Sequence, residues 1–278
     1  MIVALVDNGS LEPAAHRNLR TVAAGLAAAT GVSVHAVSWK HSDRIALPAL
    51  DGTPAWTLGR FVRAMLALGQ RDFVFVPFFV SAQGAIGSAL RSDLETLQRE
   101  LPATPFEFTF TDGLAARGAI PGIVAERVRA TIRARGLAVP PPVVVVDHGG
   151  PSPASAELRN SLAAQIRAHL GAEIRDLVAA SMEGEEHAHN LPLLADVLAR
   201  PGFGTGDVVV APLFLSPGRH AGPHGDLAEI ATEAEDRTAS SPLRTHFTGL
   251  IGDHPLAVAT LAAALRDTLS QIQAPSFA

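Results

Sequence analysis

Short apolar runs alternate along the chain with longer segments in which Ala, Leu and Val recur at helical spacing. Continuous apolar runs that do not alternate with polar residues are typical of parallel strands covered on both faces. Strands are predicted at 2–6, 32–37, 72–80, 106–110, 143–147, 174–180, 207–215 and 244–250. Helices are predicted at 13–29, 57–69, 121–135, 154–169, 190–199, 223–235 and 255–271. This order of elements predicts an α/β fold with doubly wound sheets.

The same pattern occurs twice. "IVALVDNGSLEPAA" (2–15) and "VVVVDHGGPSPAS" (143–155) each place Asp, a polar residue, Gly and a later Pro after an apolar run. A shift of about 140 residues superposes Asn8 on His148 and Gly9 on Gly149. The repeat predicts two similar flavodoxin-like lobes, each a small parallel sheet with helices on both faces. Their expected bounds are 1–136 and 143–278, joined by the Pro-rich stretch at 134–142.

Composition narrows the classes of function. The 278 residues are 47% apolar, which is enough for packed cores, and the absence of Cys excludes disulfides and thiolate metal sites. A metal site would therefore use His and carboxylate ligands. A net charge of -5 without a basic stripe argues against nucleic-acid binding, and Lys occurs once, at Lys40. No membrane span or signal peptide is apparent, so we expect a cytoplasmic protein without membrane partners.

Candidate chemistry lies where the strands of the second lobe end. Ligands of open parallel sheets bind beyond the carboxyl ends of the strands, and His148, Glu183 and His220 each follow a predicted strand there. Two imidazoles at one sheet edge can hold a divalent metal and leave coordination positions open. A carboxylate beside them can be a ligand or a proton acceptor. The alternative is that these are strand-end loop residues with a structural role.

The second lobe resembles the sirohydrochlorin chelatases of the CbiX/SirB type. The stretches "VVVVDHGGPSP", "SME", "PLFLSPGRHAGPHGDL" and "GLIGDHPL" occur in order and cover most of 143–260. The resemblance implies ATP-independent insertion of Co2+ or Fe2+, in some members Ni2+, into sirohydrochlorin, with the metal as substrate and no organic cofactor. It also implies that His148, His220 and Glu183 are catalytic and that the two His bind the metal. Neutral imidazoles can take protons or bind metal near neutral pH, which suits such a reaction.

The first lobe has lost the imidazoles. Asn8 stands in the place of His148, and Ala85 in that of His220. A second metal site is therefore not expected, and we interpret the degenerate first lobe as one wall of a cleft between the lobes that holds the tetrapyrrole. A guanidinium can pair with a substrate carboxylate as a bidentate fork, and amides and hydroxyls can add hydrogen bonds. The expected substrate-binding residues are Arg219, Asn8, Ser10 and Gln83.

Other hypotheses remain open at this stage. One is a non-catalytic tetrapyrrole- or metal-binding protein on the same scaffold. Another is a histidine-type phosphotransferase, which is disfavoured because Asp147 stands where that chemistry needs a phosphate-binding Arg. His187 and His189 lie in an acidic stretch, which we interpret as a solvated loop in preference to an accessory metal site. His224 is a weaker candidate for a residue that faces the cleft. The pattern leaves open the metal, the end pathway and whether the chain is a monomer or a homodimer.

Overall fold

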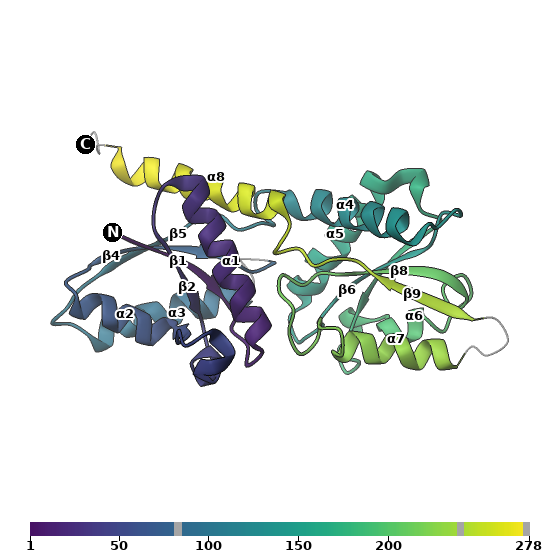
Figure 1. Cartoon of the computed structure of the whole chain (residues 1–278), viewed down its shortest axis with the longest axis horizontal. Helices are drawn as coiled ribbons and strands as arrows, with labels where there is room; N and C mark the ends of the chain where they lie inside the picture. The colour runs from purple at the N-terminus through teal and green to yellow at the C-terminus, as the bar shows by residue number, and fades with distance from the viewer. Residues whose placement is uncertain (81–84, 238–241, 275–278) are drawn as a thin grey trace. The chain divides into compact units, whose positions relative to one another are not determined.

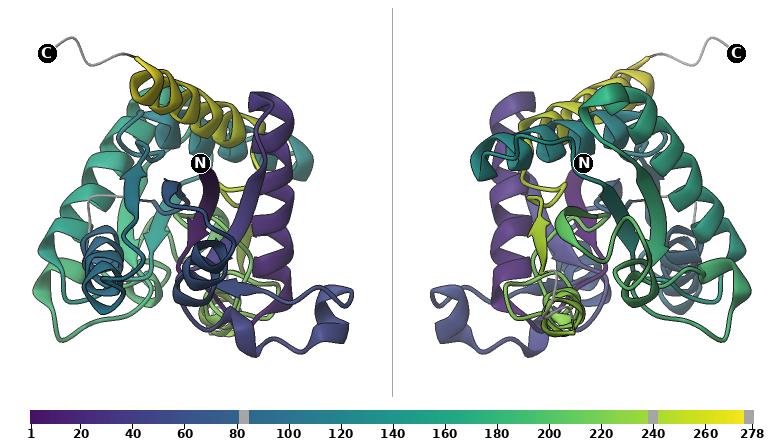
Figure 2. Two further views of the ribbon diagram at one scale, coloured as in Figure 1. Left: turned by 90° about the vertical axis from the view of Figure 1, so that its left-hand side faces the viewer. Right: turned by 90° about the vertical axis from the view of Figure 1, so that its right-hand side faces the viewer.

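The computed structural model describes residues 1–80, 85–237 and 242–274 (Figure 1; two further views in Figure 2). The chain forms two compact units. Unit 1 comprises Met1–Ala119 with Gly252–Ala278, and unit 2 comprises Ile120–Ile251. In the described part of the chain, no helix is both long enough and apolar enough to cross a membrane.

Unit 1 is built on a parallel sheet with the strand order β3-β2-β1-β4-β5. Its strands are β1 (Ile2–Asp7), β2 (Val34–Ser38), β3 (Trp56–Thr57), β4 (Asp72–Pro77) and β5 (Glu107–Phe110). Its helices are α1 (Pro13–Thr30), α2 (Leu58–Ala67), α3 (Ala85–Glu100) and α8 (Pro255–Gln273). In Figure 1, α1 and α8 lie on one side of this sheet and α2 and α3 on the other.

Unit 2 is built on a parallel sheet with the strand order β7-β6-β8-β9. Its strands are β6 (Val143–Asp147), β7 (Leu177–Ser181), β8 (Gly206–Pro212) and β9 (Leu243–Phe247). Its helices are α4 (Ala119–Arg135), α5 (Pro153–Leu170), α6 (Leu194–Val197) and α7 (Asp226–Asp236). Apart from the two-residue β3, both sheets have the same order, so the predicted flavodoxin-like α/β fold is confirmed.

Successive residues of a central strand are buried on opposite faces of each sheet. Ala4 and Val6 of β1 belong to the core beneath α2 and α3, and Val144 and Val146 of β6 to the core beneath α6 and α7. Leu5, on the other face of β1, is fully buried as well. Burial on both faces is the physical reason why the strand sequences are apolar without alternation.

Some elements differ from the sequence-based prediction. Helix α3 was not predicted, and the helix expected at 190–199 shortens to α6, because a 3-10 turn at Ala188–Asn190 and Pro192 precede it. β4 and β8 end at Pro77 and Pro212, whose backbone nitrogens have no hydrogen to donate to a ladder. The chain therefore leaves both sheets earlier than the apolar runs suggested.

The division into units also differs from the predicted bounds, 1–136 and 143–278, in the placement of two helices. Helix α8 packs on α1 in unit 1, where its Val258 approaches Gly25 and its Arg266 donates to the carbonyl of Ala29. Helix α4 belongs to unit 2, where Arg127 donates to the carbonyl of Leu250. Each half of the chain thus supplies its last long helix to the other unit.

The repeated strand-end turn is the same in both units. Gly9 and Gly149 have φ of +87° and +86°, and a Cβ on either would lie within 1.8 or 2.1 Å of a backbone oxygen of Lys40 or Glu183. Only glycine permits both this conformation and this approach. The backbone N–H of Lys40 donates to the carbonyl of Asn8, as that of Glu183 donates to His148. Lys40 therefore occupies in unit 1 the position that Glu183 occupies in unit 2.

A carboxyl group is buried beneath this turn in unit 1. Asp7 is 8% exposed, and its Oδ1 has no hydrogen-bond partner among the described residues. Burial raises the pKa of Asp7 to about 6, although a hydrogen bond with Ser38 lowers it in part. On the far side of Ser38, Nδ1 of His16 lies 3.5 Å from its hydroxyl, and burial lowers the pKa of His16 to about 4. Among the described residues Asp7 forms no ion pair, so its ionised form has no buried cation beside it.

Replacing Asp7 by Asn is expected to stabilise the protein at neutral pH. The folded-state pKa is raised from 3.8 to about 6, so the stabilisation by Asp7 is fully present below pH 3.8 and is lost as the pH rises through 6. Asp7→Asn should therefore be more stable than the parent by about 1–3 kcal/mol at pH 7.5 and nearly equal to it at pH 4. Urea unfolding at both pH values measures this. Equal destabilisation at both would contradict it.

Candidate active site

Three predicted residues come together where β6, β7 and β8 end in unit 2. The ring centroids of His148 and His220 are 4.6 Å apart, and the rings are nearly perpendicular, at 89°. Nε2 of His148 lies 3.5 Å from Oε1 of Glu183. The side chain of His148 is 45% exposed and that of Glu183 is 56% exposed, so both are accessible to a ligand from solvent. Parallel strands with a common carboxyl edge thus unite residues far apart in the sequence.

His148 presents Nε2 to Glu183. Its Nδ1 lies 3.0 Å from the carbonyl oxygen of Gly149, which can only accept a hydrogen bond, so Nδ1 carries the hydrogen. In the neutral ring, Nε2 then has a free lone pair that faces a carboxylate oxygen. At this separation both atoms can be ligands of one metal cation, and a protonated Nε2 can form an ion pair with the carboxylate.

His220 is held by a carboxylate that the sequence analysis did not select. Its Nδ1 lies 2.6 Å from Oδ2 of Asp226, so Nδ1 donates and Nε2 of the neutral ring is available for a metal or a proton. The loop closes because Leu227 donates its backbone N–H to the carbonyl of His220. A Cβ on Gly225 would lie 2.5 Å from the backbone oxygen of Arg219, so glycine permits this closure. The only sequence signal was an acidic residue six positions after the His.

A buried guanidinium lies beneath the site. Arg159 of α5 is 2% exposed and donates through Nη1 to the hydroxyl of Ser181, and the same nitrogen lies 3.5 Å from Oδ1 of Asp147. Ser181 in turn donates to Asp147 at 2.7 Å. Asp147 precedes His148 and Ser181 lies two residues before Glu183, so this network connects the strand ends that carry both site residues. In the sequence, the only indication of this network is that a charged residue, Arg159, occurs among the apolar positions of the helix predicted at 154–169.

The acidic loop after Glu183 is closed by its own hydrogen bonds. Buried Asn190 donates to the carbonyls of Gly184 and Gly150, at 2.9 and 3.1 Å. Nε2 of His189 also donates to Gly150, and its ring stacks on that of His187 at 5.3 Å. Across residues 1–80, 85–237 and 242–274, no group of three or more His, Asp or Glu side chains has an arrangement that could hold a metal ion.

The other predicted residues have different surroundings. Arg219 is exposed, and its Nε lies 3.8 Å from Oδ2 of Asp226, so it lies next to the carboxylate that contacts His220. Asn8 is exposed at the end of β1 in unit 1. The hydroxyl of Ser10 accepts the backbone N–H of Glu12, which gives it a role within its own turn. His224 is exposed in the loop after His220, and Gln83 lies outside the described residues.

Comparisons with known proteins were made for the sequence and for the fold. Residues 142–268 match the family model CbiX. No sequence among the curated proteins matches the chain. The resemblance predicted from the sequence motifs is confirmed by the family match together with the similar folds described next.

Several solved structures have a similar fold over nearly the whole chain. SirB from Bacillus subtilis with Fe3+ has 14% identity and a TM-score of 0.67, covering 98% of both chains. The sirohydrochlorin chelatase SirB from Bacillus subtilis subspecies spizizenii, in complex with cobalt, has 13% identity and a TM-score of 0.65, covering 98% of this chain and 97% of that one. CbiX, the terminal enzyme for biosynthesis of siroheme in denitrifying bacteria, has 16% identity and a TM-score of 0.61, covering 96% and 99%.

Removing the buried guanidinium is expected to destabilise the protein strongly. Arg159→Ala would leave Asp147 without its buried cation, which typically costs about 3–5 kcal/mol. Arg167→Ala on the same helix is the matched control, because its ion pair with Asp176 is half exposed and contributes about 0–1 kcal/mol. Urea unfolding of both variants measures the difference. Equal losses would show that Arg159 does not support the strand ends.

Proposed function

We propose that the chain inserts Co2+ or Fe2+ into sirohydrochlorin without ATP, because residues 142–268 match the family model CbiX and the fold is similar to those of the SirB and CbiX structures. The observation that carries the proposal is the grouping of His148, Glu183 and His220 at one sheet edge. The metal is a substrate in this reaction, and its ligands must release it. Neutral imidazoles suit this task because they bind divalent ions without adding negative charge to the site.

The geometry provides one imidazole–carboxylate pair for each proton that the macrocycle must lose. The metal-free tetrapyrrole carries two pyrrole N–H protons, and the metal replaces both. His148 with Glu183 forms one pair, and His220 with Asp226 forms the other. A carboxylate beside an imidazole stabilises the imidazolium that forms when the ring takes a proton. In this proposal the Nε2 lone pairs of His148 and His220 would hold the incoming metal, and they would accept the two pyrrole protons as the metal passes to the macrocycle.

Arg219 is proposed to pair with a carboxylate of the substrate. It is 79% exposed beside the site, and its long contact with Asp226 leaves most of its donors available. A His and carboxylate site does not select sharply between Co2+ and Fe2+, so the proposal covers both. The position of the macrocycle in a cleft between the lobes stays a prediction from the sequence.

Loss of either imidazole is expected to abolish most of the activity. His148→Ala and His220→Ala should each lower the rate of anaerobic Co2+ or Fe2+ insertion into sirohydrochlorin by about 10²–10⁴-fold, the range typical of a proton acceptor. Absorbance of the metallated product measures the rate. His224→Ala, an exposed imidazole of the same loop, is the control and should retain the parental rate. Tight tetrapyrrole binding without accelerated insertion in the parent would instead indicate a non-catalytic binding protein.

Neutralising the partner of His220 is expected to weaken catalysis without unfolding the loop. Asp226→Asn keeps an oxygen that can accept from Nδ1 but removes the negative charge that stabilises the imidazolium, so kcat should fall by about 10–100-fold. Glu229→Gln, an exposed acid in the first turn of α7, is the matched control. Steady-state kinetics with thermal unfolding as a folding check separates the two. Equal kcat for Asp226→Asn and the parent would exclude the proposed pair.

A further inference from the structure

At the carboxyl edge of the unit 1 sheet, a cationic side chain, Lys40, stands where unit 2 has Glu183, one of the candidate site residues. The backbone N–H groups of Trp39 and Lys40 donate to Asp7 and Asn8, as those of Met182 and Glu183 donate to Asp147 and His148. This equivalence is set by backbone hydrogen bonds rather than by sequence alone. Unit 1 therefore replaces the acidic member of the site by an ammonium group.

Lys40 is exposed and is the single lysine of the protein. Its Nζ lies 3.8 Å above the ring of Trp39, and Trp39 donates through Nε1 to Asp93 of α3 at 2.8 Å. Trp39 thereby holds Lys40 at the end of β2. In the following loop, Nδ1 of His41 accepts from Arg44 at 2.7 Å, which adds a second cation nearby. Of the two carboxylates in this loop, Asp43 is paired with Arg60 of α2, and Asp51 interacts electrostatically with Arg20.

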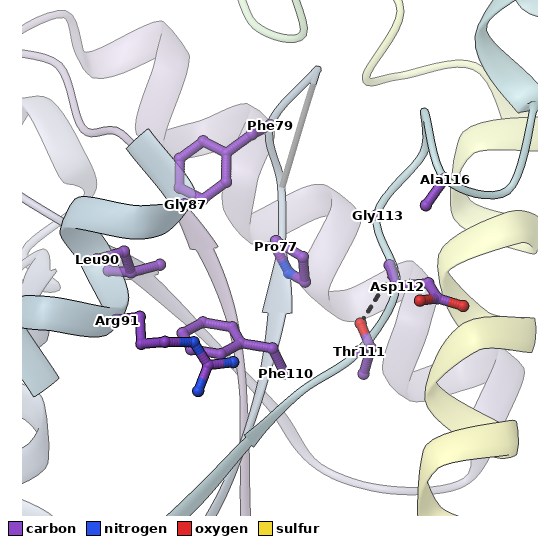
Figure 3. Close-up of a pocket in the computed structure, with 10 residues that line it drawn as sticks. All are labelled: Pro77, Phe79, Gly87, Leu90, Arg91, Phe110, Thr111, Asp112, Gly113 and Ala116. Atoms are coloured by element: carbon purple, nitrogen blue, oxygen red, sulfur yellow. Dashed lines mark hydrogen bonds between the residues drawn. The ribbon is translucent and has the colours of Figure 1, made fainter. Parts of the chain in front are cut away.

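A cavity of about 180 Å3 lies at the same edge, beyond β4 and β5 (Figure 3). Its walls include the apolar side chains of Phe79, Leu90 and Phe110. Phe79 follows β4 as Phe214 follows β8, and Phe214 is the ring beside His220, at 6.4 Å. The cavity is thus the unit 1 counterpart of the region around His220. It has an aromatic wall and no imidazole among its lining residues.

Arg91 brings a positive charge to this cavity. Its guanidinium lies 5.0 Å from the centre of the Phe110 ring, and it forms no ion pair with any residue that the structure describes. Figure 3 shows Arg91 and Asp112 at opposite sides of the cavity. Asp112 is already paired with Arg117, with Nε and Oδ2 2.9 Å apart. A pocket with an aromatic wall and one guanidinium outside any ion pair fits a carboxylate attached to an apolar or aromatic body.

We propose that the carboxyl edge of unit 1 binds two peripheral carboxylates of the tetrapyrrole, one at Lys40 and one at Arg91. The proposal rests on the proposed function and names the substrate groups that unit 1 recognises. Lys40 follows β2, whereas Arg91 belongs to α3 and lines the cavity beyond β4 and β5. Because the two cations come from different elements, each can engage its own carboxylate of one polycarboxylate ligand.

The single lysine allows a direct footprinting test on the full-length protein. An amine-acylating active ester modifies only Lys40 and the amino terminus, and Met1, which is exposed, serves as the internal control. Saturating uroporphyrin III, a stable octacarboxylate, is the probe. Acylation of Lys40 should slow at least threefold while that of Met1 is unchanged, as measured by mass spectrometry. Unchanged acylation of Lys40 at saturation would overturn the assignment of Lys40.

Binding of uroporphyrin III by the variants tests Arg91. Arg91→Ala should raise its Kd about tenfold, the loss typical of one charge-assisted hydrogen bond, and Lys40→Glu should raise it further because the charge is reversed. Arg99→Ala is the matched control, because Arg99 lies on the same helix and its donors contact Thr96 and the carbonyl of Glu95. An unchanged Kd for a folded Arg91→Ala would overturn the assignment of Arg91.

Metal insertion by the parent protein separates this inference from the proposed function. If the parent inserts metal while Lys40 stays unprotected and Arg91→Ala binds normally, the inference fails and the proposed function stands. If Lys40 is protected and Arg91→Ala binds weakly but no insertion occurs, unit 1 binds the carboxylates and the proposed function fails.

Discussion

The geometry of both sheet edges depends on one backbone contact. At each strand-end turn, a backbone carbonyl oxygen of the segment after the next strand occupies the place that a Cβ atom would take. The glycine is Gly9 in unit 1 and Gly149 in unit 2, and the oxygen belongs to Lys40 and Glu183 respectively. This contact fixes the distance between the residue after the first strand and the residue after the second. In unit 2 those residues are His148 and Glu183, so the turn brings their backbones together, and Nε2 of His148 lies 3.5 Å from Oε1 of Glu183.

The buried polar residues below the turn differ between the two units, and so does the charge that they can stabilise. Both contain an Asp–Ser pair, Asp147 with Ser181 and Asp7 with Ser38. Unit 2 adds the buried guanidinium of Arg159, so a negative charge can persist beneath the site. In unit 1, Nδ1 of His16 lies near the hydroxyl of Ser38, and burial raises the pKa of Asp7 to about 6. Among the described residues, a buried ion pair therefore lies beneath the strand-end turn in unit 2 and not in unit 1.

The sequence was sufficient to predict the features that depend on local hydrophobic pattern and on the order of the strands. Apolar runs identified the long strands, and the rule that ligands bind at strand ends selected His148, Glu183 and His220. Asp226 was missed because its importance comes from a contact made by a closed loop, and Lys40 because its equivalence to Glu183 requires a shift of 143 residues rather than the 140 of the first turn. The placement of α4 and α8 depends on helix packing between distant segments, which periodicity does not encode.

The two sheet edges carry opposite charges at equivalent positions, with Lys40 in unit 1 where Glu183 stands in unit 2. A divalent cation is repelled by an ammonium at Lys40 and a guanidinium at Arg91, so unit 1 disfavours the metal at the positions where unit 2 offers imidazoles and carboxylates. If the protein acts on a tetrapyrrole as proposed, the same cations would attract the peripheral carboxylates of that substrate. Unit 1 would then contribute to substrate binding without imidazoles, because recognition of carboxylates needs cations and not metal ligands.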